Sequence, residues 1–420
     1  MIRAVKGTRD ILPPASDVWN RVEAVAREVF RVYNYQEIRT PIFEETALFS
    51  RSVGGDTDIV SKEMYTFEDR DGSSLTLRPE VTASVMRAYI EHRLDQLPGV
   101  KKLYYGGPVF RRERPQKGRF RQFYQIGAEA IGSESPVIDA EVIGMSEDLL
   151  RRSGLDGFQL LLNSVGCSNC RPAYVQLLRE KLARVAPGMC TDCQRRAVTN
   201  PLRVLDCKVP EDQPIIETLP SILDHLDPEC REHFAVVRTS LDDRNIVYEV
   251  RPRLVRGLDY YMRTTFEFIH AGLGSQNTVL AGGRYDGLAE TIGSKVPAPG
   301  VGFSMGEDRL VMSVENTAAA PVDPLVLVTF TAGEATRRAA LGAAAELRAG
   351  GIRVELGEGK LKKVFEVANK LNARLTVICG ENELAAGTLS LKDMQTFQQS
   401  DFAREQLLER VTGCLRRGHA

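Results

Sequence analysis

The sequence predicts an α+β body built on an antiparallel sheet, a helical insertion within that body, and a separate C-terminal α/β domain with a mixed sheet. From residue 103 onward, short alternating strands are separated by turns rather than by regular crossover helices, which favours antiparallel pairing. Residues 167–244 are helical and richer in helix breakers, which indicates an insertion between strands. Beyond residue 325 strands and helices alternate, a pattern typical of a small α/β unit.

The N-terminal elements are a helix followed by a strand. Residues 17–33 repeat apolar side chains at helical spacing, and Ser16 is a suitable N-cap. We expect the helix to end at Asn34, before a β-rich run through Ile38 and Ile42. A helix of this kind can also simply pack on its own sheet, so the pattern does not decide what covers it.

A hairpin and several strands follow. Residues 103–112 and 119–126 alternate in polarity on either side of Pro115 and Gly118, which predicts a hairpin with a charged tip. Further strands are expected at residues 127–131, 159–163, 265–269 and 301–304.

The segment AAAPVDP, residues 318–324, is the best linker candidate in the chain. It divides the sequence into residues 1–322 and residues 325–420. In the second part, helices are expected at residues 334–348, 361–371 and 401–414.

Composition places limits on the kind of protein. The chain has 420 residues, of which 43% are hydrophobic and 26% charged, as in an ordinary soluble protein with two or three domains. A formal net charge of −1 excludes a globally basic nucleic-acid coat. No apolar run approaches the roughly 18 residues of a membrane span, and residues 1–14 are charged and broken by proline. We therefore expect a cytoplasmic protein without a membrane partner.

The stretch FRRERPQKGRFRQFYQ, residues 110–125, is the most informative in the chain. It places one acid and aromatic side chains beside six cations, which are Arg111, Arg112, Arg114, Lys117, Arg119 and Arg121. Arginine forks bind phosphate or carboxylate through paired hydrogen bonds. Glu113 can accept from an exocyclic amine, and Phe123 can stack on a base. The stretch suits a nucleotide, the alternative being a solvated basic hairpin.

Several ordered segments resemble a known family. The FRxE segment with its basic loop and RxF resembles motif 2 of the class II aminoacyl-tRNA synthetases, and GVGFSMGEDRL at 300–310 resembles their motif 3. The segments LVRGLDYYMRTTFEF at 254–268 and AGGRYDGL at 281–288 look like the histidine-specific motifs of the histidyl-tRNA synthetases. Further matches from end to end are KGTRDILP at 6–13, TPIFEE at 40–45, LRPEVTA at 77–83 and NPLRVLD at 200–206.

The resemblance implies a function and partners. Such an enzyme activates L-histidine with ATP and Mg²⁺ to histidyl-adenylate and transfers it to tRNA(His). It implies a class II catalytic domain, a C-terminal domain at 325–420 that reads the anticodon, and a homodimer in which the N-terminal helix and strand act as motif 1. An alternative is the catalytically silent paralogue that regulates ATP phosphoribosyltransferase, where the RGLDYY arginine and the C-terminal domain would be altered or lost. A generic nucleotide-binding module would leave the histidine-specific segments unexplained.

The resemblance also assigns the two catalytic arginines. Negative charge accumulates on phosphate oxygens in the transition state, so cations must surround it. Arg111 is implied to bridge the histidine carboxylate and the α-phosphate. Arg256 is implied to lie at the α-phosphate, the alternative being a salt bridge with Asp259. The residues implied to bind ATP are Arg111, Glu113, Arg119, Arg121, Phe123 and Arg309.

Selection of histidine requires groups that meet both ring nitrogens, because such a pocket penalises amino acids that leave them unpaired. The resemblance gives this task to Glu129 and Tyr261. The residues implied to bind histidine are Glu80, Thr82, Arg111, Gln125, Glu129, Arg256, Tyr260, Tyr261 and Tyr285.

Four of the eight cysteines form two CxxC pairs. In a cytoplasmic protein this pattern favours metal over disulfides. The order Cys167-x2-Cys170, nineteen residues, Cys190-x2-Cys193 predicts one structural zinc site of four thiolates, for which Cys207 could replace a ligand. The alternative is a set of small buried thiols without metal.

Overall fold

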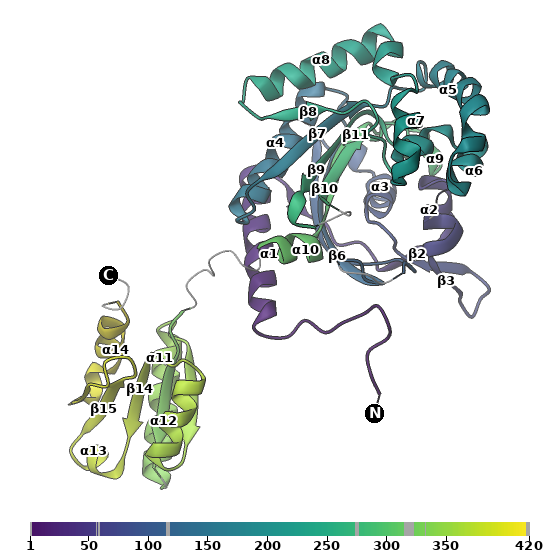
Figure 1. Ribbon diagram of the computed structural model, residues 1–420. Coiled ribbons are helices and arrows are strands. Elements are labelled where there is room, and N and C mark those ends of the chain that lie inside the picture. The colour runs from purple at the N-terminus through teal and green to yellow at the C-terminus, as the bar shows by residue number, and fades with distance from the viewer. Residues whose placement is uncertain are drawn as a thin grey trace. The chain divides into compact units, whose positions relative to one another are not determined.

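Figure 1 shows the computed structural model of the chain, which describes residues 2–55, 57, 59–114, 118–273, 277–314, 323–331 and 333–416. The chain divides into two compact units, Met1–Ala318 and Ala319–Ala420. Most of the predicted linker at 318–324 lies outside the described residues, as do Pro115 and Lys117 of the predicted hairpin tip.

An eight-stranded sheet lies at the centre of the first unit, in the order β1-β5-β6-β11-β10-β9-β7-β8. Its strands are β1 (Gln36–Glu37), β5 (Lys101–Phe110), β6 (Gln122–Ile131), β7 (Phe158–Ser164), β8 (Tyr248–Val250), β9 (Met262–His270), β10 (Thr278–Arg284) and β11 (Gly300–Gly306). All inner pairs are antiparallel, as predicted. The edge strands β1 and β8 pair in parallel with β5 and β7, because long connections precede each of these pairings.

The predicted hairpin is confirmed and is longer than expected. Strands β5 and β6 pair over their full lengths, from Lys101 opposite Ile131 to Phe110 opposite Gln122. The sequence suggested a break before Gly127, but this glycine lies within β6. A Cβ atom there would lie 2.4 Å from the Tyr105 hydroxyl on β5, so Gly127 makes room for a side chain rather than for a turn.

Helices α1 (Ala15–Val32), α4 (Pro136–Arg152) and α10 (Glu307–Val314) pack with the sheet into the largest apolar core. The buried residues of α1 recur at helical spacing: Trp19, Val22, Ala26, Val29 and Phe30. The prediction of Ser16 as the N-cap is wrong. The helix begins at Ala15 after Pro14, whose fixed φ suits a helix start, so Ser16 lies in the first turn and no side chain caps this end.

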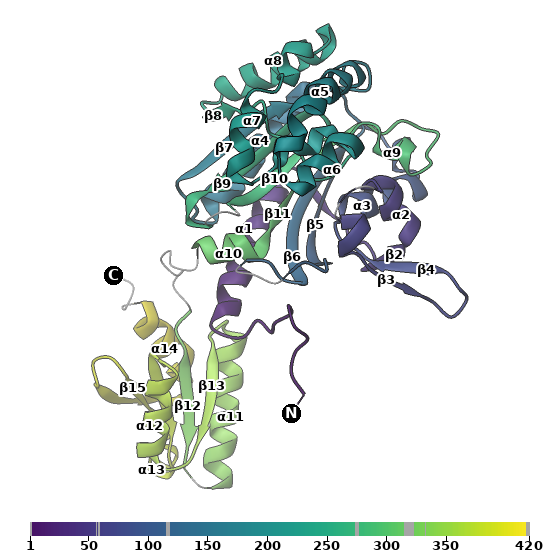
Figure 2. The same cartoon turned by 45° about the vertical axis from the view of Figure 1, so that its right-hand side comes forward.

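A second, smaller layer of the first unit is the sheet β2-β4-β3, formed by β2 (Phe43–Glu45), β3 (Tyr65–Glu68) and β4 (Ser74–Leu77). Figure 2 shows α2 (Thr46–Ser52) and α3 (Thr82–Glu91) beside it. The short helices η1 (Ile59–Glu63), η2 (Leu94–Gln96), η7 (Ala271–Leu273) and α9 (Leu288–Thr291) complete this unit outside the insertion.

The segment 167–244 is helical, as predicted. Its helices are α5 (Arg171–Val185), α6 (Thr191–Thr199), α7 (Gln213–Glu217) and α8 (Pro228–Asp242), with 3₁₀ turns η3 (Ala186–Gly188), η4 (Pro201–Asp206), η5 (Pro210–Asp212) and η6 (Ile222–His225). Tyr174, Leu178 and Leu182 of α5 form a core of their own together with buried cysteines. Helix α8 also packs on the main core through Phe234 and Val237.

The second unit has a mixed sheet of order β13-β12-β14-β15-β16, as predicted. Strands β12 (Val326–Phe330), β13 (Val354–Glu358) and β14 (Leu375–Cys379) are parallel, while β15 (Thr388–Asp393) and β16 (Gln399–Ala403) are antiparallel. The helices are α11 (Glu334–Ala349), α12 (Leu361–Lys370), α13 (Glu381–Ala385), η8 (Arg404–Gln406) and α14 (Leu407–Arg416). Throughout the described parts of both units, none of the helices is sufficiently long and apolar to cross a membrane.

Candidate active site

A cavity of about 730 Å³ opens over the main sheet of the first unit. Its wall combines β6, β9, β10 and β11 with the start of α3, the loop 256–261 and the edge of the insertion. The predicted site residues that line it are Glu80, Thr82, Arg111, Glu113, Arg119, Phe123, Gln125, Arg256, Tyr260, Tyr261 and Arg309. Segments more than two hundred residues apart therefore meet in one place.

One part of the cavity is rich in arginine. The guanidinium of Arg111 lies 5.4 Å from the centre of the Phe123 ring, and its Nε donates to the Pro79 carbonyl at 2.8 Å. Glu113 accepts from Arg119 at 2.7 Å and lies 3.9 Å from Arg111. Burial and the nearby charges of Arg119 and Arg111 lower the pKa of Arg309. Arg111, Arg119 and Arg309 thus lie close together around Glu113, and this concentration of positive charge favours a polyanion.

Arg256 lies half-buried at the other side of this region. It forms an ion pair with Glu267 on β9, and its guanidinium lies 5.7 Å from the centre of the Tyr261 ring. Burial opposes its charge, but the attraction of Glu267 raises the pKa of Arg256 overall. The alternative salt bridge with Asp259 does not form. Asp259 instead accepts from the Asn200 amide at 3.0 Å.

Glu129 is the centre of a buried hydroxyl network. Its carboxylate accepts hydrogen bonds from Thr82 at 2.7 Å, from Tyr285 at 2.6 Å and from Tyr105 at 3.4 Å. Burial raises its pKa to about 8. On the facing strand stands Gly302, where a Cβ atom would lie 1.7 Å from a Glu129 carboxylate oxygen. The network depends on that missing side chain.

Glu129 and Tyr285 are not among the residues that line the cavity, although both belong to the predicted set. They lie behind the wall and are coupled to it through Thr82, which does line it. Tyr105, a lining residue bonded to Glu129, was not predicted. Its position on β5, opposite Gly127, was the only sequence signal that could have indicated it.

Two buried acceptor atoms face the cavity without a partner among the described residues. Glu80 uses one carboxylate oxygen to accept from the Ala83 amide at 3.0 Å, while its Oε2 has no partner. The side-chain oxygen of Gln125 also has none. Burial raises the pKa of Glu80. Unpaired buried acceptors are costly, so this pair of atoms fits a ligand with several donors, such as an ammonium group.

Arg121, the remaining predicted ATP ligand, does not line the cavity. Its backbone amide donates to the Gly7 carbonyl at 2.7 Å, which ties the N-terminal segment to the start of β6. Nearby, Arg9 forms an ion pair with Asp308 at 2.8 Å, and Asp308 also accepts from the Tyr124 amide at 2.9 Å. These contacts brace the region that carries Phe123.

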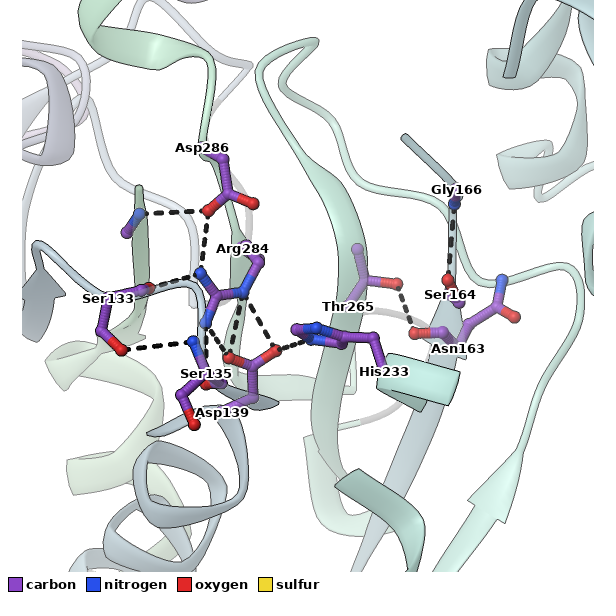
Figure 3. Close-up of polar contacts among 11 residues, drawn as sticks. Ser133, Ser135, Asp139, Asn163, Ser164, Gly166, His233, Thr265, Arg284 and Asp286 are labelled. Carbon is purple, nitrogen blue, oxygen red and sulfur yellow. Dashed lines mark hydrogen bonds and ion pairs between the residues drawn. The ribbon is translucent and has the colours of Figure 1, made fainter. Parts of the chain in front are cut away.

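A buried charge network that the sequence analysis did not predict surrounds Arg284 (Figure 3). Arg284 and Asp139 are both fully buried and form an ion pair between β10 and α4. His233 on α8 contacts the same carboxylate at 2.8 Å, and Asp286 accepts from Arg284 at 2.8 Å. Burial alone would raise the pKa of Asp139, but His233 and Arg284 lower it overall. The network fixes Tyr285, the next residue in the chain after Arg284.

The predicted site of four cysteines is not assembled. Cys167 and Cys170 lie in a first cluster with Asp227 and Cys230, whereas Cys190 and Cys193 lie in a second cluster with Cys207 and Asp212. In each cluster the candidate ligand atoms lie within 4.8 Å of one another. The two CxxC pairs therefore belong to different clusters, each of which is completed by a third cysteine and an aspartate. Cys207 is a partner, as the sequence allowed, but it adds to a pair rather than replacing a ligand.

Comparisons with known proteins agree with this geometry. A family profile described as "Histidyl-tRNA synthetase" matches residues 7–310, and one described as "Anticodon binding domain" matches residues 325–413. The protein named histidine–tRNA ligase from Solibacter usitatus is 66% identical, over 98% of this chain and 99% of the relative. The one from Koribacter versatilis is 59% identical, over 97% of this chain and 95% of the relative.

Solved structures show the same likeness. The apo histidyl-tRNA synthetase of Staphylococcus aureus superposes with a TM-score of 0.82 at 37% identity, covering 98% of this chain and 99% of that one. The structure from Nostoc, at 21% identity and a TM-score of 0.71, shares the fold. Since the first profile spans most of the chain and the relatives cover nearly all of it, the chain belongs to the histidyl-tRNA synthetase family.

Proposed function

We propose that this protein is a histidine–tRNA ligase that activates L-histidine with ATP and transfers the histidyl group to tRNA(His). The observation that carries the proposal is the pairing of two features in one cavity. Unpartnered acceptors on Glu80 and Gln125 suit an α-ammonium group, and the arginines that suit phosphates line the same wall. An amino acid and ATP can therefore meet there.

In the first step the histidine carboxylate attacks the α-phosphate in line, and diphosphate leaves. Arg111 has access to both reacting groups, because it lines the cavity near Phe123, the proposed platform for adenine. Arg256 supplies a fixed cation for the charge that develops on the α-phosphate. Its link to Glu267 holds the fork in one orientation before substrate arrives. Arg309 would hold the terminal phosphate, and Mg²⁺ enters with ATP as part of the substrate.

Glu113 has a further task in this scheme. Its carboxylate is engaged by Arg119 at 2.7 Å. When ATP binds, Arg119 can exchange this carboxylate for a phosphate oxygen, which leaves Glu113 to accept from the adenine amine. Arg121 is then assigned to tRNA or to the support of the nucleotide loop.

Recognition of the imidazole is assigned to Tyr261 and to the Glu129 network. The carboxylate of Glu129 fixes the hydroxyls of Thr82 and Tyr285, so the donors and acceptors around the ring are oriented in advance. Tyr260 and Tyr261 add two aromatic rings, whose centres lie 4.7 Å apart. A pocket built this way rejects amino acids that leave its polar groups unpaired.

The second step transfers histidine to the terminal ribose of tRNA(His), and the unit at 325–413, which matches the anticodon-binding profile, would read the anticodon. We propose a homodimer, supported by the exposed apolar side chains Ile42, Phe43 and Phe67 on and beside the small sheet. We propose a cytoplasmic location, because the substrates of such a ligase are found there. The silent regulatory paralogue is not favoured, because Arg256 lies in the cavity and the C-terminal unit is present.

Exchange of labelled diphosphate into ATP tests the proposal. Exchange should require histidine, and it should not occur with glutamine or phenylalanine, which share the α-amino and carboxylate groups but not the imidazole. Exchange of similar rate with either would refute the assignment of the pocket.

A further inference from the structure

We propose that the helical insertion binds two zinc ions in two separate sites, and that these sites hold the two ends of the loop 256–261. The first cluster would provide one site and the second cluster the other, each with three sulfurs and one carboxylate. The proposal concerns metal binding and the position of this loop, so it does not depend on which amino acid the active site selects.

The spacing of the ligand atoms in the first cluster suits a tetrahedral ion. With zinc–sulfur bonds of about 2.3 Å, tetrahedral geometry sets neighbouring sulfurs about 3.8 Å apart. The Sγ of Cys170 lies 3.8 Å from that of Cys167 and 3.9 Å from that of Cys230. The Cys167 sulfur is also 3.0 Å from a carboxylate oxygen of Asp227.

Backbone amides support the same ligand atoms. The amide of Cys167 donates to the Cys170 sulfur at 3.2 Å, and that of Asn169 donates to the Cys167 sulfur at 3.3 Å. The Asp227 carboxylate accepts from the Cys230 amide at 2.7 Å through its other oxygen. Donors aimed at sulfur and carboxylate stabilise their anionic forms, which are the forms that bind metal.

The second cluster repeats this arrangement. The Cys190 and Cys207 sulfurs lie 3.8 Å apart, and the Cys207 sulfur is 3.2 Å from an Asp212 oxygen. Both carboxylate oxygens of Asp212 accept from the Cys190 amide, at 3.0 and 3.2 Å, and the Val209 amide donates to the Cys207 sulfur at 3.4 Å. Two unrelated segments have thus produced the same donor set.

Zinc explains these clusters better than a disulfide or inert thiols. Three thiols can form one disulfide, which would leave a third thiol beside a carboxylate. Asp212 is only 2% exposed and accepts hydrogen bonds within the cluster, so its carboxylate is held in place beside the three sulfurs as a ready fourth ligand. Thiolate-rich tetrahedral sites select zinc over the hard cations magnesium and calcium. A bound Zn²⁺ would use all four ligands of each cluster at once.

Each cluster is linked to one end of the loop that carries the catalytic arginine. Arg171 directly follows Cys170 and donates to the Tyr261 carbonyl at 2.5 Å and to the Val165 carbonyl at 3.1 Å. Arg203, in the turn η4 before Cys207, donates to the Arg256 carbonyl at 2.9 Å. The second cluster also borders the cavity itself through Cys190 and Cys207. Zinc would thereby fix both arginines and, through them, the loop.

Metal analysis of the full-length protein, purified under reducing conditions without chelator, is the first test. Wild type should contain two zinc ions per chain. The variants Cys170→Ser and Cys193→Ser should each contain one, and Cys414→Ser, altered in the second unit, should retain two. A metal-free wild type, or a wild type with a single ion that both insertion variants lose, would overturn the proposal.

Wild type alone provides a second test that does not depend on the folding of variants. The six cysteines of the two clusters should resist alkylation in the zinc-bound protein and react once zinc is removed, whereas Cys379, fully buried in the second unit, should resist in both states. Cobalt exchanged into the protein should show the absorption of tetrahedral thiolate cobalt at two ions per chain. If these six thiols react with the alkylating reagent before zinc is removed, or are found as disulfides, the proposal of two metal sites would be wrong.

The positioning role has its own test. Arg203→Gln should keep two zinc ions yet slow histidyl-adenylate formation by about 10- to 100-fold, the usual range for residues that support a site. Cys193→Ser should slow the same step, with a smaller change in the KM for ATP. An unchanged rate in Arg203→Gln would refute the link between the second site and Arg256.

Discussion

Replacing Arg256 with Gln should lower both the stability of the protein and the rate of histidyl-adenylate formation. The structure pairs this guanidinium with Glu267, and the two side chains keep 18% and 16% of their exposure. Removing one partner of a fully buried pair costs about 3–5 kcal/mol, so this partly hydrated pair should cost less, about 2–3 kcal/mol. If the charge acts mainly in the transition state, adenylate formation should also slow by about 10²–10³-fold, the loss typical of one preorganised donor.

The double variant Arg256→Gln/Glu267→Gln distinguishes the two effects. Its neutral amides can bond to each other, so the free energy of unfolding should recover most of the loss, whereas the rate should stay low. Single-turnover quench-flow measurement of histidyl-adenylate, alongside denaturant unfolding, records both quantities, and Glu267→Gln completes the cycle. The reasoning would be refuted if the rate returned together with the stability, because Arg256 would then serve only to hold the loop.

Three further outcomes are expected. Truncation after residue 322 should leave a folded first unit that activates histidine but charges tRNA poorly; unchanged charging would remove the anticodon role of the second unit. Gly302→Ala should sharply raise the KM for histidine, since its Cβ would lie 1.7 Å from Glu129, while Gly342→Ala, which meets nothing within 4 Å, serves as control. Asp139 has a pKa below its ordinary value of 3.8, so the stability it provides is present above about pH 4 and is lost as pH falls through the folded-state pKa. Asp139→Asn should therefore lower the free energy of unfolding at pH 7 and weaken its dependence on pH below pH 4. Denaturant unfolding measured across this pH range is the test, and an unchanged pH dependence would contradict the prediction.

Local patterns predicted the elements that carry the site. Alternation over residues 103–112 and 119–126 identified the hairpin, and the cations between these strands identified the region that lines the cavity. Both signals are local in sequence, because a strand repeats every two residues and a turn is formed by neighbouring residues. Boundaries were less certain. Ser16 suits a cap, yet Pro14 starts the helix two residues earlier than expected.

Partners far apart in sequence could not be predicted. Asp139 contacts Arg284 from 145 residues away and His233 from 94 residues away, and no spacing rule connects them. The available sequence signal was Arg284 itself, a charged residue at the end of an apolar strand. A buried arginine needs partners of opposite charge, but the sequence does not say which residues these are. Likewise, CxxC spacing identified Cys167 and Cys190 as candidate ligands but not which third cysteine each pair would meet.

Two glycines near the site are required because other groups lie close to where their side chains would be. Gly302 and Gly283 lie opposite each other in paired strands. A Cβ atom at Gly302 would lie 1.7 Å from a Glu129 carboxylate oxygen, and one at Gly283 would lie 2.6 Å from the Thr264 carbonyl and 2.9 Å from the Tyr261 ring. These glycines are needed because another side chain enters the sheet where theirs would be. The position of Glu129 behind the wall of the cavity thus depends on a residue of a different strand. A substitution at either glycine should therefore impair histidine recognition by displacing Glu129 or Tyr261, although neither of these side chains is itself replaced.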